Sequence, residues 1–283
     1  MTTEGPYSPP GRLERILLAT DGSAYCAGAE RIALALAAQS GARLSIVSVV
    51  LSNPEAEVEA SDLIRAAEED TRAVLARVHE RAVARGLAAE TFAPRGIEPA
   101  AEIAAAAQAQ RADIVVMGRR GTRGLMRRML GDATSRVLGA ARCNVLVAPE
   151  GADFWRTRVL LATDGSRFSD AAAVAAETIA ALGRLPVTVV SVVRESFTAQ
   201  RAAEADAAAA RVQAQLSAHG LDADAVVLRG DPAERIVATA AARGADLIVM
   251  GTHGRTGWQR VLIGSVTEAV INGTALPVLA VKP

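Results

Sequence analysis

The segment Leu17-Leu18-Ala19-Thr20-Asp21-Gly22-Ser23 returns unchanged as Leu160-Leu161-Ala162-Thr163-Asp164-Gly165-Ser166. A second pair of segments, residues 112–118 and 245–251, shares an Ala-Asp start and a Val-Met-Gly end. The offset between the copies falls from 143 to 133 between these pairs, so the first copy carries ten extra residues. A repeat of about 140 residues is far longer than a solenoid unit. The repetition therefore predicts two duplicated domains.

Each copy alternates short β-branched apolar runs with long alanine-rich segments of helical periodicity. Near-continuous apolar strands separated by helices predict an α/β fold, a parallel sheet covered on both faces. The expected strands are residues 15–20, 43–49, 90–94, 114–118 and 144–148 in the first copy, and 158–163, 187–192, 225–229, 247–251 and 277–281 in the second. The expected helices include residues 26–40, 55–85, 169–182 and 195–219.

Proline, glycine and charge mark the expected domain boundaries. Residues 1–11 read as a disordered tail, residues 12–150 as domain 1 and residues 157–283 as domain 2. Phe154 and Trp155 follow the linker, and either anchor one domain on the other or cap the core of domain 2. The last strand of each domain is apolar and is expected at a sheet edge, where unpaired strands invite pairing. We therefore expect an intramolecular pseudo-dimer of the two domains, or a homo-oligomer.

The composition excludes several classes of protein. With 31 basic and 31 acidic residues, no overall field attracts nucleic acid or an anionic membrane. No apolar run reaches the ~20 residues of a membrane span, and the first residues lack a signal-peptide pattern. Cys26 and Cys143 cannot form a disulfide framework and are expected to be free thiols, while the three histidines lack metal-ligand spacing. The expectation is a cytoplasmic protein without nucleic-acid or membrane partners.

The residues that carry chemistry follow the first and fourth expected strands. In an open parallel sheet, ligands bind beyond the carboxyl ends of the strands. Asp21 and Asp164 end strand one, and glycine-rich segments, residues 118–124 and 251–257, follow strand four. In the second copy Gly264-Ser265-Val266-Thr267 then opens a helix, whose N–H and hydroxyl groups suit a phosphate. The carboxylate suits a ribose hydroxyl or a metal that bridges phosphates. The pattern predicts a nucleotide site.

The spacing Gly-x2-Gly-x9-Gly-Ser, together with Asp-Gly-Ser after strand one, resembles the universal stress protein family, in its tandem form, over residues 13–283. The resemblance implies two repeated Rossmann-like domains of five strands, which often bind ATP and commonly dimerise through the last strand, without a shared catalytic reaction. The matching positions of domain 2 are Asp164, Val192, Met250, Gly251, His253, Gly254, Gly264, Ser265, Val266 and Thr267. Those of domain 1 are Asp21, Val49, Met117, Gly118, Gly121 and Gly131.

Domain 1 departs from the pattern at Asp132, which replaces the serine after the last glycine. An aspartate suits a helix start but repels a triphosphate, because two like charges ~4 Å apart repel by about 1 kcal/mol in water and about 4 kcal/mol at an effective dielectric of ~20. An arginine cluster around the loop could restore phosphate binding, contact an acidic partner or form a solvated surface: Arg119, Arg120, Arg123, Arg127 and Arg128. We predict a competent second site and a weakened first one.

No catalytic residue is assigned. The chain contains neither a Gly-x4-Gly-Lys-Ser/Thr phosphate loop nor a Gly-x-Ser-x-Gly elbow, and Lys282 is its only lysine. The leading hypothesis is an ATP-binding regulator of the stress response that acts through nucleotide-dependent conformation and an unidentified protein partner. The alternatives are a nucleotide-independent interaction or scaffold protein and a slow ATP hydrolase. Whether magnesium accompanies ATP is left open.

Overall fold

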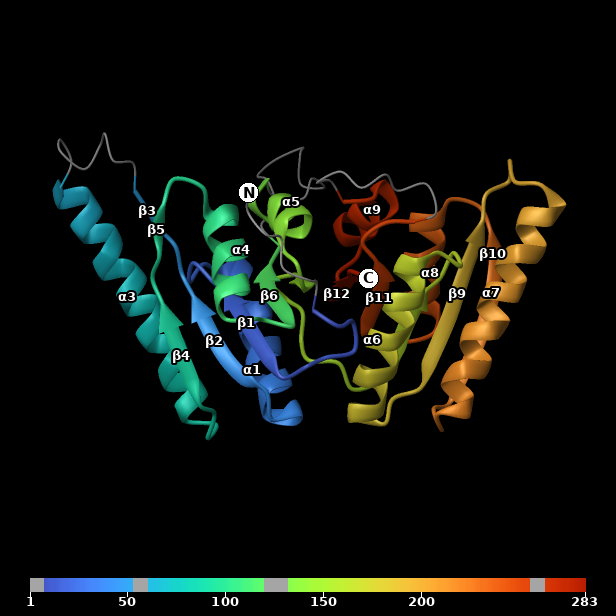
Figure 1. The fold of residues 1–283 in the computed structure, drawn as a ribbon, viewed down its shortest axis with the longest axis horizontal. Coiled ribbons are helices and arrows are strands. Elements are labelled where there is room, and N and C mark those ends of the chain that lie inside the picture. Colours follow the sequence, from blue (N-terminus) through green and yellow to red (C-terminus); the bar gives the residue numbers. More distant parts are fainter. Residues whose placement is uncertain (1–7, 53–60, 120–131, 255–262) are drawn as a thin grey trace.

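The computed structural model describes residues 8–52, 61–119, 132–254 and 263–283. Its main sheet has the strand order β10-β9-β8-β11-β12-β7-β6-β1-β2-β4 (Figure 1). The N-half, residues 8–148, contributes β1 (Arg15–Ala19), β2 (Arg43–Val47), β4 (Ala89–Phe92), β6 (Ile114–Gly118) and β7 (Asn144–Ala148). The C-half, residues 156–283, contributes β8 (Val159–Ala162), β9 (Val187–Val193), β10 (Ala223–Arg229), β11 (Leu247–Gly251) and β12 (Val278–Val281).

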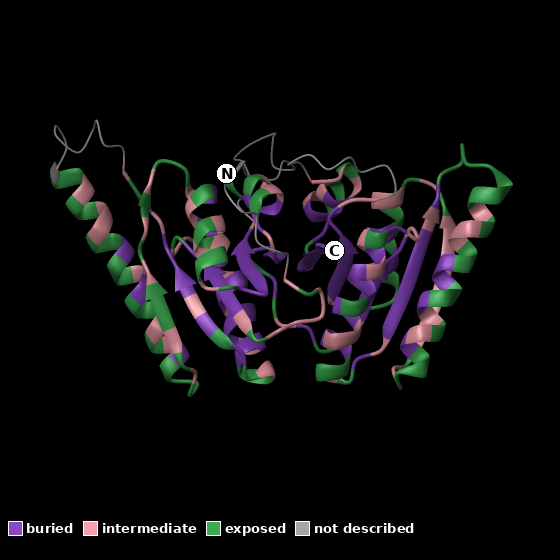
Figure 2. Ribbon diagram, viewed as in Figure 1, coloured by how far each residue is buried: buried purple, intermediate pink, exposed green. Residues whose placement is uncertain are grey.

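Helices cover both faces of this sheet, as the sequence predicts. One face carries α1 (Ala27–Ser40), α3 (Ser61–Val83), α6 (Arg167–Gly183) and α7 (Ala199–Ala218). The other carries α4 (Pro99–Ala109), α5 (Asp132–Ala140), α8 (Pro232–Ala242) and α9 (Ser265–Gly273). The apolar cluster under each helix layer contains residues of both halves, and Figure 2 shows the buried strands between the layers. The α/β architecture is confirmed.

The strand order places a crevice in each half. Within the C-half, β8, β9 and β10 run outward in one direction, and β11 and β12 in the other, all parallel. The N-half repeats this arrangement around β1 and β6. The loops that leave β8 and β11 at their carboxyl ends therefore diverge toward opposite sides, which opens a crevice between them. The described residues of the segments singled out in the C-half lie at this edge.

The two halves join through their last strands. β7 and β12 pair antiparallel, with Val147 opposite Val278, Leu146 opposite Leu279 and Val145 opposite Ala280. Each strand would otherwise present an unpaired apolar edge, and pairing satisfies the backbone groups of both. The expected intramolecular pseudo-dimer is therefore present as one continuous sheet.

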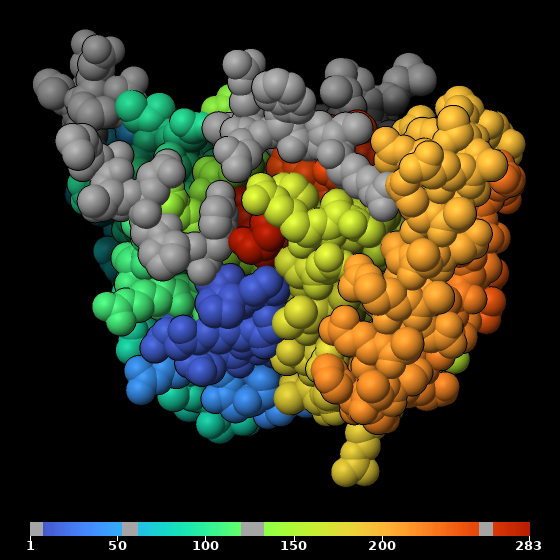
Figure 3. All heavy atoms as spheres, turned by 45° about the vertical axis from the view of Figure 1, so that its right-hand side comes forward, coloured from blue at the N-terminus to red at the C-terminus, as the bar shows by residue number. Residues whose placement is uncertain are grey.

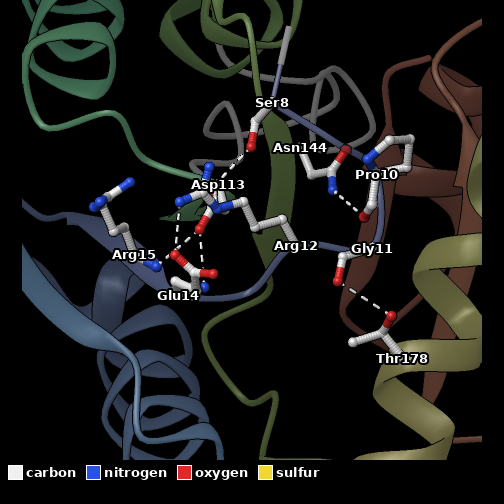
Figure 4. A network of polar contacts seen from close by, with 9 residues as sticks. All are labelled: Ser8, Pro10, Gly11, Arg12, Glu14, Arg15, Asp113, Asn144 and Thr178. Atoms are coloured by element: carbon white, nitrogen blue, oxygen red, sulfur yellow. Dashed lines mark hydrogen bonds and ion pairs between the residues drawn. The ribbon is translucent and has the colours of Figure 1, made fainter.

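The residues before β1 lie across the junction of the halves (Figure 4). Ser8 donates a hydrogen bond to Asp113 of the N-half at 2.7 Å, and Thr178 on α6 donates to the carbonyl of Gly11 at 3.2 Å. The side chain of Asn144 donates to the carbonyl of Pro10 at 3.0 Å. Figure 3 shows this blue segment directly against the C-half surface. The expectation of a disordered tail is wrong for residues 8–11, because their polar groups find partners in both halves. Residues 1–7 lie outside the described residues.

β2 ends earlier than the sequence predicts. The expected strand runs to residue 49, but β2 stops at Val47, and a separate short strand β3 (Val50–Leu51) pairs with β5 (Arg95–Gly96). Pro94 lies opposite this break and has no N–H to donate to the ladder. In the C-half, where no proline interrupts them, β9 and β10 pair over seven residues.

The linker packs onto α1. Arg31 donates to the carbonyls of Glu150 and Ala152, both at 2.7 Å. Trp155 is 2% exposed, stacks on Phe154 with ring centroids 4.6 Å apart, and belongs to the apolar cluster that includes residues of both halves. These contacts support the interpretation that the aromatic pair anchors one half on the other.

Candidate functional site

A cavity of about 350 Å³ opens at the crevice of the C-half. Its wall combines the ends of β8, β9 and β11 with the start of α9. All ten positions that the sequence singles out in domain 2 line it: Asp164, Val192, Met250, Gly251, His253, Gly254, Gly264, Ser265, Val266 and Thr267. The volume lies in the range of small-molecule sites, about 300–1,000 Å³. The fold thus brings segments about 100 residues apart in the chain into one wall.

Asp164 is held by the turn that follows β8. Its Oδ1 accepts the N–H of Ser166 at 3.0 Å, an Asx turn that needs Gly165 in the left-handed region at φ 73°. A Cβ placed on Gly254 would lie 2.7 Å from Oδ2 of Asp164. Glycine at 254 therefore leaves room for the carboxylate at the cavity wall.

Gly251 is required by helix packing. A Cβ there would lie 2.7 Å from Cβ and 2.9 Å from the carbonyl oxygen of Phe168, in α6. Gly118 has the same role in the N-half, where a Cβ would lie 2.4 Å from the carbonyl oxygen of Tyr25. Neither glycine has a positive φ, and neither does Gly254 or Gly264. At Gly118, Gly251 and Gly254, neighbouring protein atoms take the space that a side chain would need.

The first turn of α9 offers backbone donors to the cavity. Gly264 occupies the N-cap position and provides no side-chain cap, whereas Ser166 caps α6 and Asp231 caps α8. The first amides of a helix have no intrahelical acceptor and carry the positive end of the helix dipole. Thr267 is 2% exposed and its hydroxyl donates to the carbonyl of Gly251 at 2.9 Å, so it holds α9 on β11. Ser265 is exposed and keeps its hydroxyl at the cavity.

Sequence reasoning missed the loop after β9. Arg194, Phe197 and Arg201 also line the cavity, and the Arg201 guanidinium lies 5.6 Å from the centre of the Phe197 ring. Because β9 ends at the same sheet edge as β8, its following loop was a recognisable candidate. Among the described residues of the wall these two arginines outnumber the carboxylates, of which Asp164 is one, so the charge there suits an anion.

His253 belongs to the cavity wall. Its ring is half-buried and lies 5.2 Å from the ring of Phe168, and its Nδ1 is 3.2 Å from the hydroxyl of Thr252. The sequence leaves two alternatives for this residue, a phosphate contact and a surface loop. In the structure His253 lines the cavity, which is compatible with either alternative.

In the N-half, Asp21, Met117 and Gly118 lie at the corresponding strand ends, Val49 lies in the break between β2 and β3, and Gly121 and Gly131 lie outside the described residues. Asp21 accepts the N–H of Ser23 at 3.0 Å and the thiol of Cys26 at 3.3 Å. Burial, and then the charge of Asp21, raise the pKa of Cys26, so the thiol stays protonated and can donate.

Asp132 is the first residue of α5, and Thr134 repeats the contact of Thr267 by donating to the carbonyl of Gly118 at 3.4 Å. Arg119 does not join a cluster around the N-half loop, because its guanidinium donates to carbonyls at the end of α9. Arg120, Arg123, Arg127 and Arg128 lie outside the described residues.

The described part of the chain contains neither a metal-binding cluster nor a membrane span. No group of three or more His, Cys, Asp or Glu side chains there could hold a metal ion. Nor does that part contain a helix with the length and apolar character needed to cross a membrane.

The model of the universal stress protein family matches residues 12–149 and 156–282, almost the whole chain. The chain belongs to the universal stress protein family. A universal stress protein of Methanocaldococcus jannaschii is 44% identical over 79 residues, 28% of this chain and 46% of that relative. One of Mycobacterium tuberculosis is 31% identical over 185 residues, 60% of this chain and 62% of the relative. The chain thus spans less than two thirds of the length of these relatives.

Solved structures share the tandem fold of this universal stress protein. A universal stress protein from Archaeoglobus fulgidus superposes with a TM-score of 0.79 at 22% identity, covering 95% of this chain and 98% of that one. A protein of unknown function from Pseudomonas aeruginosa has a TM-score of 0.70 at 20% identity, covering 97% and 94%. At these identities the likeness supports the fold.

Proposed function

We propose that this universal stress protein is a cytoplasmic regulator of the stress response whose C-half cavity binds ATP. The observation that carries the proposal is the convergence of the Asp-Gly-Ser turn, the end of β9, the glycines after β11 and the start of α9 around one cavity. Nucleotide would connect these segments and so change the surface offered to a protein partner. In this proposal, separate parts of the cavity wall contact the adenine base, the ribose and the phosphates of ATP.

The residues present fit an adenine nucleotide. Val192, Ile236 and Met250 provide an apolar wall for the base. The carboxylate of Asp164 suits the ribose hydroxyls, while the amides of the first turn of α9, with Arg194 and Arg201, suit the phosphates. Among the wall residues that the structure describes, Asp164 supplies the carboxylate, so a magnesium ion would take most of its ligands from phosphate and water.

Isothermal titration of the full chain with ATP tests the proposal, using Ser265→Asp. A carboxylate at the first turn of α9 repels the phosphates by about 1 kcal/mol if exposed to water and about 4 kcal/mol at an effective dielectric of ~20, so affinity falls at least about fivefold. The matched control is Ser217→Asp on the exposed far end of α7, which leaves affinity unchanged. A wild-type chain that takes up no ATP, or a Ser265→Asp variant that binds normally, contradicts the proposal.

The N-half site is proposed to be weakened by Asp132. Changing Asp132→Ser removes one negative charge from the start of α5 and restores the residue type that α9 has at Ser265. The expected result is a titration stoichiometry that rises from about one ATP per chain toward two. An unchanged stoichiometry of one would show that the charge of Asp132 is not what limits binding in the N-half.

The nucleotide-independent alternative rests on that same aspartate, because one of two duplicated sites lacks the hydroxyl at its helix start. Mass spectrometry of freshly purified, then denatured, protein separates the two hypotheses. Co-purified adenine nucleotide favours the ATP-binding regulator, whereas its absence together with a flat titration favours a scaffold protein.

A further inference from the structure

Two cationic side chains reach from one half to the other, and each donates hydrogen bonds to carbonyls at the end of a helix. Arg119 directly follows β6 in the N-half, and its Nη1 donates to the carbonyls of Ile271 and, at 2.6 Å, Thr274. These carbonyls belong to the last turn of α9 in the C-half. Lys282 directly follows β12, and its Nζ donates to the carbonyls of Ala141 and, at 3.2 Å, Gly139, at the end of α5 in the N-half. Each half thus supplies the cation for a helix of the other.

A cation at a helix C-terminus satisfies carbonyls that have no intrahelical donor and interacts favourably with the negative end of the dipole. Lys282 is buried and Arg119 is half-buried. Burial lowers the pKa of Arg119 and lowers that of Lys282 to about 8. A partly desolvated guanidinium gains from acceptors that replace its lost water, so the bonds from Arg119 hold the end of α9.

The other end of α9 is the first turn that lines the C-half cavity. α9 has nine residues and therefore a length of about 13 Å, with its hydrogen bonds internal. Over so short a distance a helix moves as a rigid body. A displacement at Ile271 and Thr274 is consequently transmitted to the amides of Ser265 and Val266.

The two crossing contacts are not copies of one another. At the offset of 133 residues that relates the fourth and fifth strands of the halves, Arg119 corresponds to Thr252, and Lys282 corresponds to Pro149. The duplicated pattern therefore does not contain either contact. Each arises only because β7 and β12 place the end of one half's helix beside a strand end of the other.

We propose that Arg119 is a positioning residue for the C-half site: by holding the C-terminal end of α9 from the other half, it sets where the first-turn amides of α9 meet the ligand phosphates. The identity of the ligand rests on the proposed function, whereas the placement of α9 does not.

The experiment uses the full chain with Arg119→Ala, Arg119→Lys and, as a matched control, Lys282→Met, which removes the cation at the end of α5. Hydrogen exchange without ligand is measured for residues 265–274 and 132–141. In Arg119→Ala, exchange rises in α9 and not in α5, and Lys282→Met gives the reverse. In titrations, ATP affinity falls about tenfold in Arg119→Ala, recovers in part in Arg119→Lys, and stays near wild type in Lys282→Met.

Millimolar guanidinium ion added to Arg119→Ala restores part of the affinity, which a general loss of structure would not allow. Unchanged exchange of α9 in Arg119→Ala overturns the proposal, whatever happens with ATP. So does raised exchange of α9 with unchanged ATP affinity. If the wild-type chain binds no ATP but hydrogen exchange in α9 still rises in Arg119→Ala, the proposed function is wrong. The inference that Arg119 holds the end of α9 is then still supported.

Discussion

At the scale of single residues, Gly118 and Gly251 show how tightly the helices of the α1 and α6 layer approach the sheet. Both glycines end the fourth strand of their half, and in both places the backbone of a neighbouring segment occupies the space of a side chain. Backbone atoms cannot move aside as the end of a flexible side chain can. An added methyl group must therefore shift the whole segment.

We expect Gly251→Ala to lower the free energy of unfolding by about 1–3 kcal/mol, the usual cost of overpacking, and Gly118→Ala to lower it at least as much. Urea denaturation of the full chain measures both. Gly151→Ala is the control, because no atom lies within 4 Å of its added Cβ, and its effect should stay within about 0.5 kcal/mol. Equal stability of the Gly251→Ala and Gly151→Ala variants would refute the packing argument.

At the scale of elements, the last strands and the short helices α5 and α9 depend on one another. β12 pairs with β7, and Lys282 continues from β12 to the carbonyls at the end of α5. Lys282 is only 7% exposed, and its backbone N–H donates to Asn144 at 3.2 Å. The only lysine of the chain thus sits at the junction between halves, at a cost in solvation.

This cost predicts a pH dependence of stability. Burial lowers the pKa of Lys282 from 10.5 to about 8, against a weaker opposing effect of Cys143, whose own pKa is raised to about 12 by burial. Between pH 8 and 10.5 the Lys282 amine is protonated in the unfolded chain and neutral in the folded chain. The contribution of Lys282 to the free energy of unfolding therefore rises with pH in this interval. Below pH 8 the Lys282 amine is charged in both states, and its burial lowers the free energy of unfolding by about 3 kcal/mol.

The measurement compares the free energy of unfolding of wild type and Lys282→Met at several pH values. The difference, wild type minus variant, should increase as pH rises from about 8 toward 10.5. Groups elsewhere titrate alike in both proteins and cancel. A difference that is flat or falls over this interval would contradict the assignment.

At the scale of the whole molecule, the two halves form one sheet and share the apolar layer on each face. Besides this shared core, the halves are joined by the β7–β12 ladder, the segment of residues 8–11, the linker with its aromatic pair, and the contacts of Arg119 and Lys282. Such a shared core couples the stability of one half to that of the other.

We therefore expect a single cooperative unfolding transition. In a Trp258→Phe background, emission reports only the buried Trp155 at the junction, and its urea transition should coincide with that of far-UV circular dichroism. An early fluorescence change, followed by a separate loss of secondary structure, would show that the halves separate before they unfold.

Much of the fold and of the C-half site was predictable, because the information is local. Apolar runs bounded by turn residues locate the strands, and a repeated Asp-Gly-Ser and glycine pattern locates the ends where they open into the crevice. The break of β2 was missed because it depends on Pro94 of the neighbouring strand. The cavity residues Phe197, in the loop after β9, and Arg201, in the first turn of α7, were missed because this segment carries no motif.

Alone, the amino-acid sequence determined the duplicated α/β architecture, the family and the positions gathered at the sheet's carboxyl edge, since periodicity and turn chemistry act over a few residues. Only the tertiary structure decided why Gly251 must be glycine, where residues 8–11 lie and what Arg119 contacts. Those properties depend on which atoms from distant segments occupy the neighbouring space. Arg119 meets the end of α9, 152 residues away, because two strand edges pair, and no local pattern records that meeting.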